Sequence, residues 1–297
     1  MFEFGDMMGG IARWERIFVI VVFLFGFGSI LGWCLEVLFR RFISDTNPER
    51  KWINPGFLVG PCLPIYGFGN IALFGLSLVP SIGNGVWVEP TWQRVVISII
   101  IMGVMMTLIE YIAGIIFIKR MNIKLWDYSG NRGNIQGIIC PLFSFLWTVL
   151  GAVYYFLIQP YIVKMVLWLY DNVGFIFFIG IYFGVLLTDL AYSFNVAGKL
   201  KAYAKENAII IRYEELKENI RKYNEDHNIA SKFFGTFVSN ISIREHLDAY
   251  KEKLAGIKTT VASDLSEVKN AVASDLSEVK QAVANEITEI KEKVEKH

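Results

Sequence analysis

Five apolar segments alternate with polar loops over the first 195 residues of the chain. They cover residues 17–39, 56–79, 94–118, 136–158 and 174–194. A helix needs about 20 apolar residues to cross the hydrocarbon core of a bilayer, and each segment supplies that length. The pattern therefore predicts an all-α fold, a polytopic membrane helical bundle of about five spans, with residues 1–195 as its transmembrane domain.

Beyond the fifth segment the pattern becomes that of charged, water-soluble helices. Residues 196–240 predict a helical segment, and residues 241–297 predict a helix with an 11-residue repeat, VASDLSEVKNA, VASDLSEVKQA and VANEITEIKEK. Its apolar positions recur at about 3.67 residues per turn, which is typical of a coiled coil. The apolar stripe has no aromatic residues, unlike most membrane-surface helices. We expect this helix to form a homo-oligomer; the alternative is that it packs back on residues 199–226.

Basic residues alternate between the loops and so predict the orientation of the spans. Lys and Arg gather between the first and second segments and between the third and fourth, whereas the loop from 80 to 93 has none. Because cytoplasmic loops are enriched in Lys and Arg, we expect the N-terminus outside and the C-terminal tail in the cytoplasm. Arg13 and Arg16 weakly favour the opposite orientation.

Composition excludes several kinds of chemistry. The three histidines all follow residue 226, so this chain cannot build a histidine base or a histidine metal cage within the membrane. The cysteines Cys34, Cys62 and Cys140 lie in or beside apolar segments and form no disulfide framework. The net charge is +1, and we expect no cofactor and no nucleic-acid partner, with the lipid bilayer as the main surrounding.

A short motif occurs twice in the membrane half. Aligning Asn54 with Asn131 gives NPGFLVGPCLPI above NRGNIQGIICPL, in which Asn, two Gly and a Pro coincide. A glutamate precedes each copy, Glu36 and Glu110 respectively. This predicts a two-helix unit repeated in the same orientation, with a symmetry axis along the membrane normal. Chance similarity is the alternative, since Gly and Pro are common in membrane helices.

Proline and glycine interrupt the start of the second segment. Proline removes a backbone donor, and glycine weakens helices, so Gly56, Gly60, Pro61 and Pro64 predict an unwound or re-entrant stretch there. Non-helical backbone at membrane depth is tolerated only where it is buried in protein or lines a cavity. Such a stretch can present backbone groups to a ligand.

Polar residues of the first four segments converge on the predicted cytoplasmic side. An acidic residue inside a span is costly unless it faces protein or water, so Glu36 and Glu110 should face a shared interior site. We expect the binding residues to be Glu36, Asn54, Gly56, Gly60, Pro61, Pro64, Tyr66, Glu110, Trp126, Asp127, Tyr128, Asn131 and Asn134.

Structural roles are the alternatives for several of these residues. Glu36 has Arg40 four residues on, which is the spacing of an ordinary helical ion pair. Trp126 and Tyr128 suit an interfacial aromatic belt, and Asp127 suits a helix cap. Glu110 has no basic residue close enough in sequence for a local pair.

Several motifs carry a resemblance to a known family. LGWCLEV, NPGFLVGPCLPIYGFG, LIEYIAG and LWDYSGNRGNIQGIICPLFSFLW resemble the bacterial putative ABC-transporter type IV membrane proteins, over about residues 25–155. The resemblance implies a location in the bacterial plasma membrane and a transport role. Members typically carry Arg after the first Asn, where this chain has Pro55; the second copy does have Arg132.

The leading hypothesis is a permease-like protein whose site takes a small polar or ionic substrate or a lipid head group. The chain has no GxxxxGK[ST] phosphate loop, so an ATPase would be a separate subunit. One alternative is a membrane enzyme acting on a lipid, with Glu110 and Asp127 as acid and base. Another is a non-catalytic scaffold or sensor that works through its tail.

Overall fold

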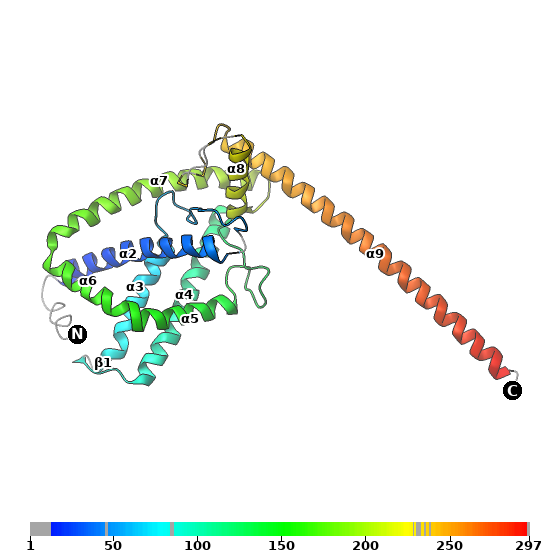
Figure 1. Cartoon of the computed structure of the whole chain (residues 1–297), viewed down its shortest axis with the longest axis horizontal. Coiled ribbons are helices and arrows are strands. Elements are labelled where there is room, and N and C mark those ends of the chain that lie inside the picture. The colour runs from blue at the N-terminus through cyan, green and yellow to red at the C-terminus, as the bar shows by residue number, and fades with distance from the viewer. Residues whose placement is uncertain are drawn as a thin grey trace. The chain divides into compact units, whose positions relative to one another are not determined.

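The chain divides into two units, Met1–Asn240 and Ile241–His297. The computed structural model describes residues 13–44, 47–83, 86–227, 229, 233–234, 236–237 and 239–295, so the first twelve residues of the predicted membrane domain lie outside it. Figure 1 traces the elements along the chain. The α-helices are α2 (Arg13–Phe42), α3 (Pro64–Leu78), α4 (Trp92–Ile116), α5 (Pro141–Val153), α6 (Gln159–Asp171), α7 (Ile176–Glu206), α8 (Tyr213–Asp226) and α9 (Ile243–Glu295).

Short elements join these helices. Two strands form a small antiparallel hairpin between α3 and α4, and two others pair in parallel although they lie far apart in sequence. The strands are β1 (Ile82–Gly83), β2 (Val86–Trp87), β3 (Ile123–Lys124) and β4 (Ile211–Arg212). The short helical turns are η1 (Val79–Ser81), η2 (Phe117–Met121), η3 (Tyr154–Ile158) and η4 (Val173–Phe175), of which η2 and η3 are π-helical.

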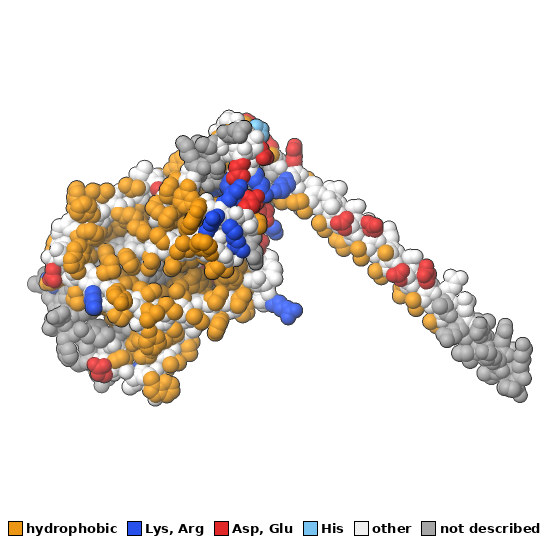
Figure 2. All heavy atoms as spheres, in the orientation of Figure 1, with side chains coloured by type: hydrophobic (Ala, Val, Ile, Leu, Met, Phe, Trp, Pro, Cys, Tyr) orange, Lys and Arg blue, Asp and Glu red, His pale blue; other side chains and the backbone are white. Residues whose placement is uncertain are grey.

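The prediction of an all-α membrane bundle is confirmed. Within the described residues, four helical stretches are long and apolar enough to cross a membrane: Trp14–Phe42, Trp92–Met121, Pro141–Asp171 and Val173–Glu206. Their outward faces are apolar, and Figure 2 shows hydrophobic side chains over most of the visible face of the first unit. On α7, Phe177, Val185 and Leu187 are each more than 60% exposed. Exposed apolar surface on this scale suits contact with lipid.

Three predicted segments differ from the helices observed. The second segment becomes a helix only at Pro64, because proline disfavours helical backbone in the residue before it. The resulting 15-residue α3 is about 22 Å long, shorter than the bilayer core. The fourth helix continues through the expected loop from 159 to 173 as far as Asp171, and the fifth continues to Glu206.

Each return helix packs beside the helix that precedes it. Helix α2 packs on α3, α4 packs on α5, and α3 packs on α4 between the two pairs. The apolar core at this junction includes Leu24, Leu73, Met102 and Met106. Where the helices approach most closely a glycine is required: a Cβ atom at Gly103 would overlap the side chain of Thr148. Small residues at such contacts are typical of membrane helix packing.

The two motif copies take the same position in the fold. Pro64 begins α3 and Pro141 begins α5, each after a residue with extended backbone. The loops before them differ in detail. Gly133 and Gly137 have positive φ, whereas Gly56 and Gly60 do not. The matched glycines therefore have different backbone conformations in the two loops.

Candidate functional site

Glu36 sits in a network of charged and hydroxyl groups. Its Oε1 atom accepts a hydrogen bond of 2.9 Å from the Arg40 Nε atom, and its Oε2 atom accepts one of 3.1 Å from the Tyr66 hydroxyl. Arg40 also forms an ion pair of 3.4 Å with Glu214 on α8. Glu36 is therefore a paired charge, as the Glu–Arg spacing indicated.

Glu110 has a very different environment. Its side chain lies in the interior of the bundle, with only 4% of the residue exposed. Oε1 accepts a hydrogen bond of 2.9 Å from the Tyr128 hydroxyl, and Oε2 accepts one of 3.0 Å from the Trp147 indole nitrogen. Both donors are neutral, and no basic side chain of the described residues forms an ion pair with this carboxylate. A buried carboxylate without a counter-charge favours binding a proton or a cation.

Aromatic rings connect the two glutamates. The Tyr66 ring meets the Trp147 ring edge-on, with their centroids 6.0 Å apart. Because Tyr66 bonds Glu36 and Trp147 bonds Glu110, the contact joins one acidic residue from each motif copy. We call Glu36, Tyr66, Glu110, Tyr128 and Trp147 the glutamate cluster.

Tyr128 is held firmly in this cluster. Its ring stacks on Phe143 with centroids 4.3 Å apart. Burial and the neighbouring Glu110 raise the pKa of the Tyr128 hydroxyl well above its usual value. The hydroxyl therefore keeps its proton at ordinary pH and remains a hydrogen-bond donor to Glu110.

The first loop is organised around the buried side chain of Asn54. The Oδ1 atom accepts hydrogen bonds from the Trp33 indole at 2.9 Å and from the Gly56 backbone N–H at 3.2 Å. The Nδ2 atom donates to the carbonyls of Leu58 and Val59. The Asn54 side chain therefore holds three backbone groups of its own loop and ties the loop to Trp33 on α2.

Helix α7 supplies the acceptor for the N–H groups of the same loop. The Asp189 carboxylate accepts hydrogen bonds from the Val59 N–H at 3.0 Å and the Gly60 N–H at 2.7 Å. The Ser193 hydroxyl donates to the same carboxylate. A Cβ atom at Gly60 would lie 3.0 Å from an Asp189 oxygen, which explains why a glycine fits there.

Lys217 on α8 supplies the donor for two carbonyl groups of the same loop. Its Nζ atom donates to the carbonyls of Asn54 at 2.7 Å and Gly56 at 3.2 Å, and the residue is only 8% exposed. Burial lowers the pKa of Lys217 despite the opposing effect of nearby Glu214. Four backbone groups of the unwound stretch, two N–H groups and two carbonyls, thus have side-chain partners within the protein.

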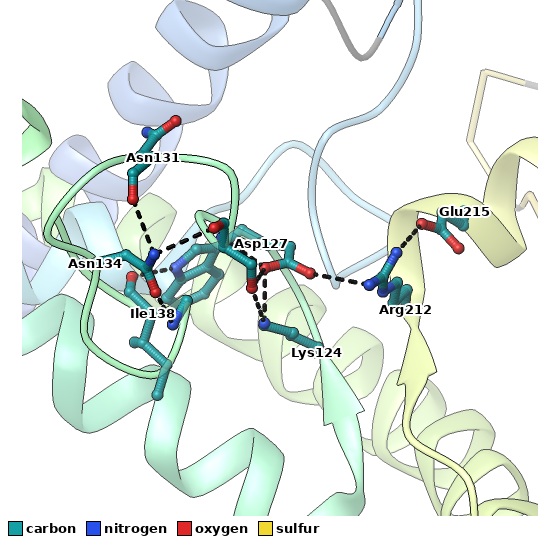
Figure 3. Close-up of polar contacts among 10 residues, drawn as sticks. Lys124, Asp127, Asn131, Asn134, Ile138, Arg212 and Glu215 are labelled. Carbon is teal, nitrogen blue, oxygen red and sulfur yellow. Dashed lines mark hydrogen bonds and ion pairs between the residues drawn. The ribbon is translucent and has the colours of Figure 1, made fainter. Parts of the chain in front are cut away.

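The second loop is closed by ion pairs near its surface. Asp127 accepts a hydrogen bond of 2.7 Å from Lys124 and lies 3.6 Å from Arg212, which in turn pairs with Glu215 (Figure 3). Burial alone would raise the pKa of Asp127, but hydrogen bonds from Lys124 and Ser129 outweigh it and lower the pKa. These contacts fit a structural role and leave Asp127 poorly suited to act as an acid or base.

The remaining motif residues brace the turn before α5. Asn134 donates to the Asn131 carbonyl at 2.8 Å and accepts from the Gly137 N–H at 2.9 Å, as Figure 3 shows in part. The Asn131 amide contacts the Cys140 sulfur, and the Trp126 indole donates to the Ile138 carbonyl. Each contact fixes the path of the loop.

The predicted residues fall into distinct groups. Glu36, Tyr66, Glu110 and Tyr128 come together in the glutamate cluster; Asn54, Gly56 and Gly60 form the first loop; Pro61 is exposed, and Pro64 begins α3; Trp126, Asp127, Asn131 and Asn134 belong to the second loop. No group of three or more metal-ligating His, Cys, Asp or Glu side chains occurs within the part of the chain that the structure describes.

The predicted binding residues do not include Trp147, Asp189 and Lys217, which complete these contacts. Lys217 carried a usable signal, because it falls on the same helical face as Tyr213, Leu216 and Ile220, an apolar stripe at helical spacing. Trp147 had no such signal, since it is one of three aromatic residues in a helix that contains no charged residue.

The fold and its buried acidic cluster define a polytopic α-helical membrane protein. Residues 23–194 match the putative ABC-transporter type IV family, and this match covers more than half of the chain. The chain therefore belongs to that family and is a transport-related membrane protein. No curated protein and no solved structure matches it significantly.

Proposed function

We propose that the protein is a permease-like transporter in which Glu110 binds the transported species. The observation that carries the proposal is the setting of this carboxylate, which is buried and, among the described residues, is hydrogen-bonded by Tyr128 and Trp147 alone. A proton, a metal cation or the ammonium group of a lipid head would supply the missing positive charge. Glu36 would contribute the second acidic group, exchanging its Arg40 partner as the substrate moves.

The proposed orientation places the glutamate cluster toward the cytoplasm of a bacterial cell. The loops beside Arg40 and Lys124 carry most of the Lys and Arg of the first 195 residues, and Figure 2 shows charged side chains gathered around α8. A cytoplasmic tail and an external N-terminus satisfy the preference of basic loops for the cytoplasm.

A separate ATPase subunit would power transport if the family's description applies to this chain. The sequence itself lacks the phosphate-binding loop motif of such ATPases. A carrier driven by an ion gradient is the other energy source that the proposal allows. Purification with native lipids, followed by native mass spectrometry, separates the two because a bound ATPase adds its own mass.

Replacing Glu110 by Gln tests the central claim. The substitution keeps the size and the hydrogen-bonding oxygen of the side chain but removes its charge. The detergent-solubilised wild type should gain thermal stability with at least one chloride salt in a panel of sodium, potassium, ammonium, magnesium and ethanolammonium, because a ligand stabilises the state that it binds. Glu110→Gln should show no gain with any of them.

Glu49→Gln is the matched control, because Glu49 is an exposed carboxylate paired only at the surface with Lys51. It should behave like the wild type in every salt. The proposal is wrong if Glu110→Gln keeps the wild-type response. It is also wrong if the wild type responds to no cation and its stability is independent of pH across the range in which a carboxylate titrates.

A further inference from the structure

Helix α9 carries an uninterrupted apolar stripe. Its repeat places apolar residues on one face, and Figure 2 shows hydrophobic side chains along one edge of the helix and acidic ones along the opposite edge. The stripe residues are between 48% and 65% exposed: Val261, Leu265, Val268, Val272, Leu276, Val279 and Val283. A single helix cannot bury such a stripe, so we expect another helix or surface to pack against it.

Charge is distributed unequally on the two sides of this stripe. Successive residues turn by about 100° around a helix, so Asp264 lies about 60° to one side of Val261 and Lys269 about 80° to the other. The next repeat places Asp275 and Lys280 in the same two positions. One flank of the stripe is therefore acidic, and the other is basic.

This arrangement distinguishes the two ways in which identical helices can pair. In a parallel pair, the left flank of one helix faces the right flank of its partner, so acidic residues meet basic ones. In an antiparallel pair, each flank faces its own copy, so like charges meet on both sides. Flanking charges set the orientation of coiled coils in this way. The flanks of α9 are complementary only in the parallel arrangement.

We propose that α9 binds the α9 helix of a second copy of this chain in a parallel coiled coil. Asp264 of each copy would face Lys269 of the other, and Asp275 would face Lys280. A lipid surface is a poor occupant, because the stripe has no aromatic residue and its polar face carries both acidic and basic side chains. The inference does not depend on what the protein transports.

Cysteine cross-linking in the full-length protein tests the orientation. Val261→Cys and Val283→Cys place thiols near opposite ends of the stripe. In a parallel pair each variant should form a disulfide-linked dimer with itself under mild oxidation, since equivalent positions meet. A mixture of the two variants, carrying tags of different size, should then give almost no mixed dimer. The wild type, with its own three cysteines, is the control.

Two double variants test the charge pairing. Asp264→Lys with Asp275→Lys makes both flanks basic, and Lys269→Glu with Lys280→Glu makes both acidic. Each should dissociate at about tenfold higher protein concentration than the wild type at low salt, and mixing them should restore association. A predominant mixed cysteine dimer would show antiparallel pairing and overturn the proposal. A chain that stays monomeric, or that binds only a different protein through the stripe, would overturn it too.

Discussion

A buried lysine and a half-buried aspartate hold the broken stretch before α3 from opposite sides. Asp189 on α7 accepts hydrogen bonds from two N–H groups of the loop, and Lys217 on α8 donates to two of its carbonyls. Lipid offers no hydrogen bonds, so these backbone groups need partners within the protein. The prolines and glycines of the motif therefore create a structure that only distant side chains can complete.

Replacing Lys217 by Met should destabilise this loop. The change keeps the length of the side chain but leaves the carbonyls of Asn54 and Gly56 without their donor, at a cost of about 1–3 kcal/mol in the free energy of unfolding. Heating in detergent should show a lower unfolding midpoint. Lys222→Met is the control, since Lys222 lies on the same helix and pairs at the surface with Glu218. Equal midpoints for the two variants would contradict the role given to Lys217.

At the scale of elements, close contacts between helices fix the position of the glutamate cluster. A Cβ atom at Gly32 would overlap the Tyr66 side chain, whose hydroxyl bonds Glu36. Gly103 makes the corresponding close approach between α4 and α5, against Thr148. Because α5 also carries Trp147, this contact sets the distance from the indole to Glu110.

Gly103→Ala should therefore loosen the packing of α4 on α5. The added methyl group overlaps Thr148, and overpacking of this kind costs about 1–3 kcal/mol. The same substitution at Gly184 is the control, since no atom lies within 4 Å of a Cβ atom there. Thermal unfolding in detergent should show a lower midpoint for Gly103→Ala and an unchanged or slightly higher one for Gly184→Ala. The packing argument fails if both variants unfold at the wild-type temperature.

For the first unit as a whole, the segment after α7 ties both motif copies together. Strand β4 pairs with β3, just before the second copy, and Arg212 reaches Asp127 in the same loop. Helix α8 forms ion pairs with the residues that lead into the first copy, through Glu214 with Arg40 and Glu225 with Lys51. Residues 211–225 therefore contact both loops and connect one to the other.

Removal of the stripe separates the transport function from assembly. A chain ending at Gly256 keeps the whole first unit and the first turns of α9, but it loses every exposed stripe residue from Val261 onward. This chain should be monomeric by native mass spectrometry, with the cation response of the wild type unchanged. Loss of the cation response together with assembly would favour the alternative of a scaffold that works through its tail.

The sequence by itself determined the membrane helices, the interruption before Pro64 and the helical tail. These features depend on local patterns, namely runs of apolar residues, the backbone limits of proline, and an 11-residue period. It also predicted that Glu36 and Glu110 lie at corresponding ends of alternating spans, and the structure brings the two residues together in the glutamate cluster.

Only the tertiary structure decided which groups complete the site. Glu110 meets Trp147 across 37 positions of the chain, and Asn54 meets Lys217 across 163. Partners so far apart depend on how whole helices pack, which no local pattern records. The same packing supplied side-chain hydrogen-bond partners to the loop backbone. It also left Glu110 buried without a basic partner among the described residues. That difference in surroundings, invisible in two similar motifs, separates the proposed binding residue from its paired counterpart.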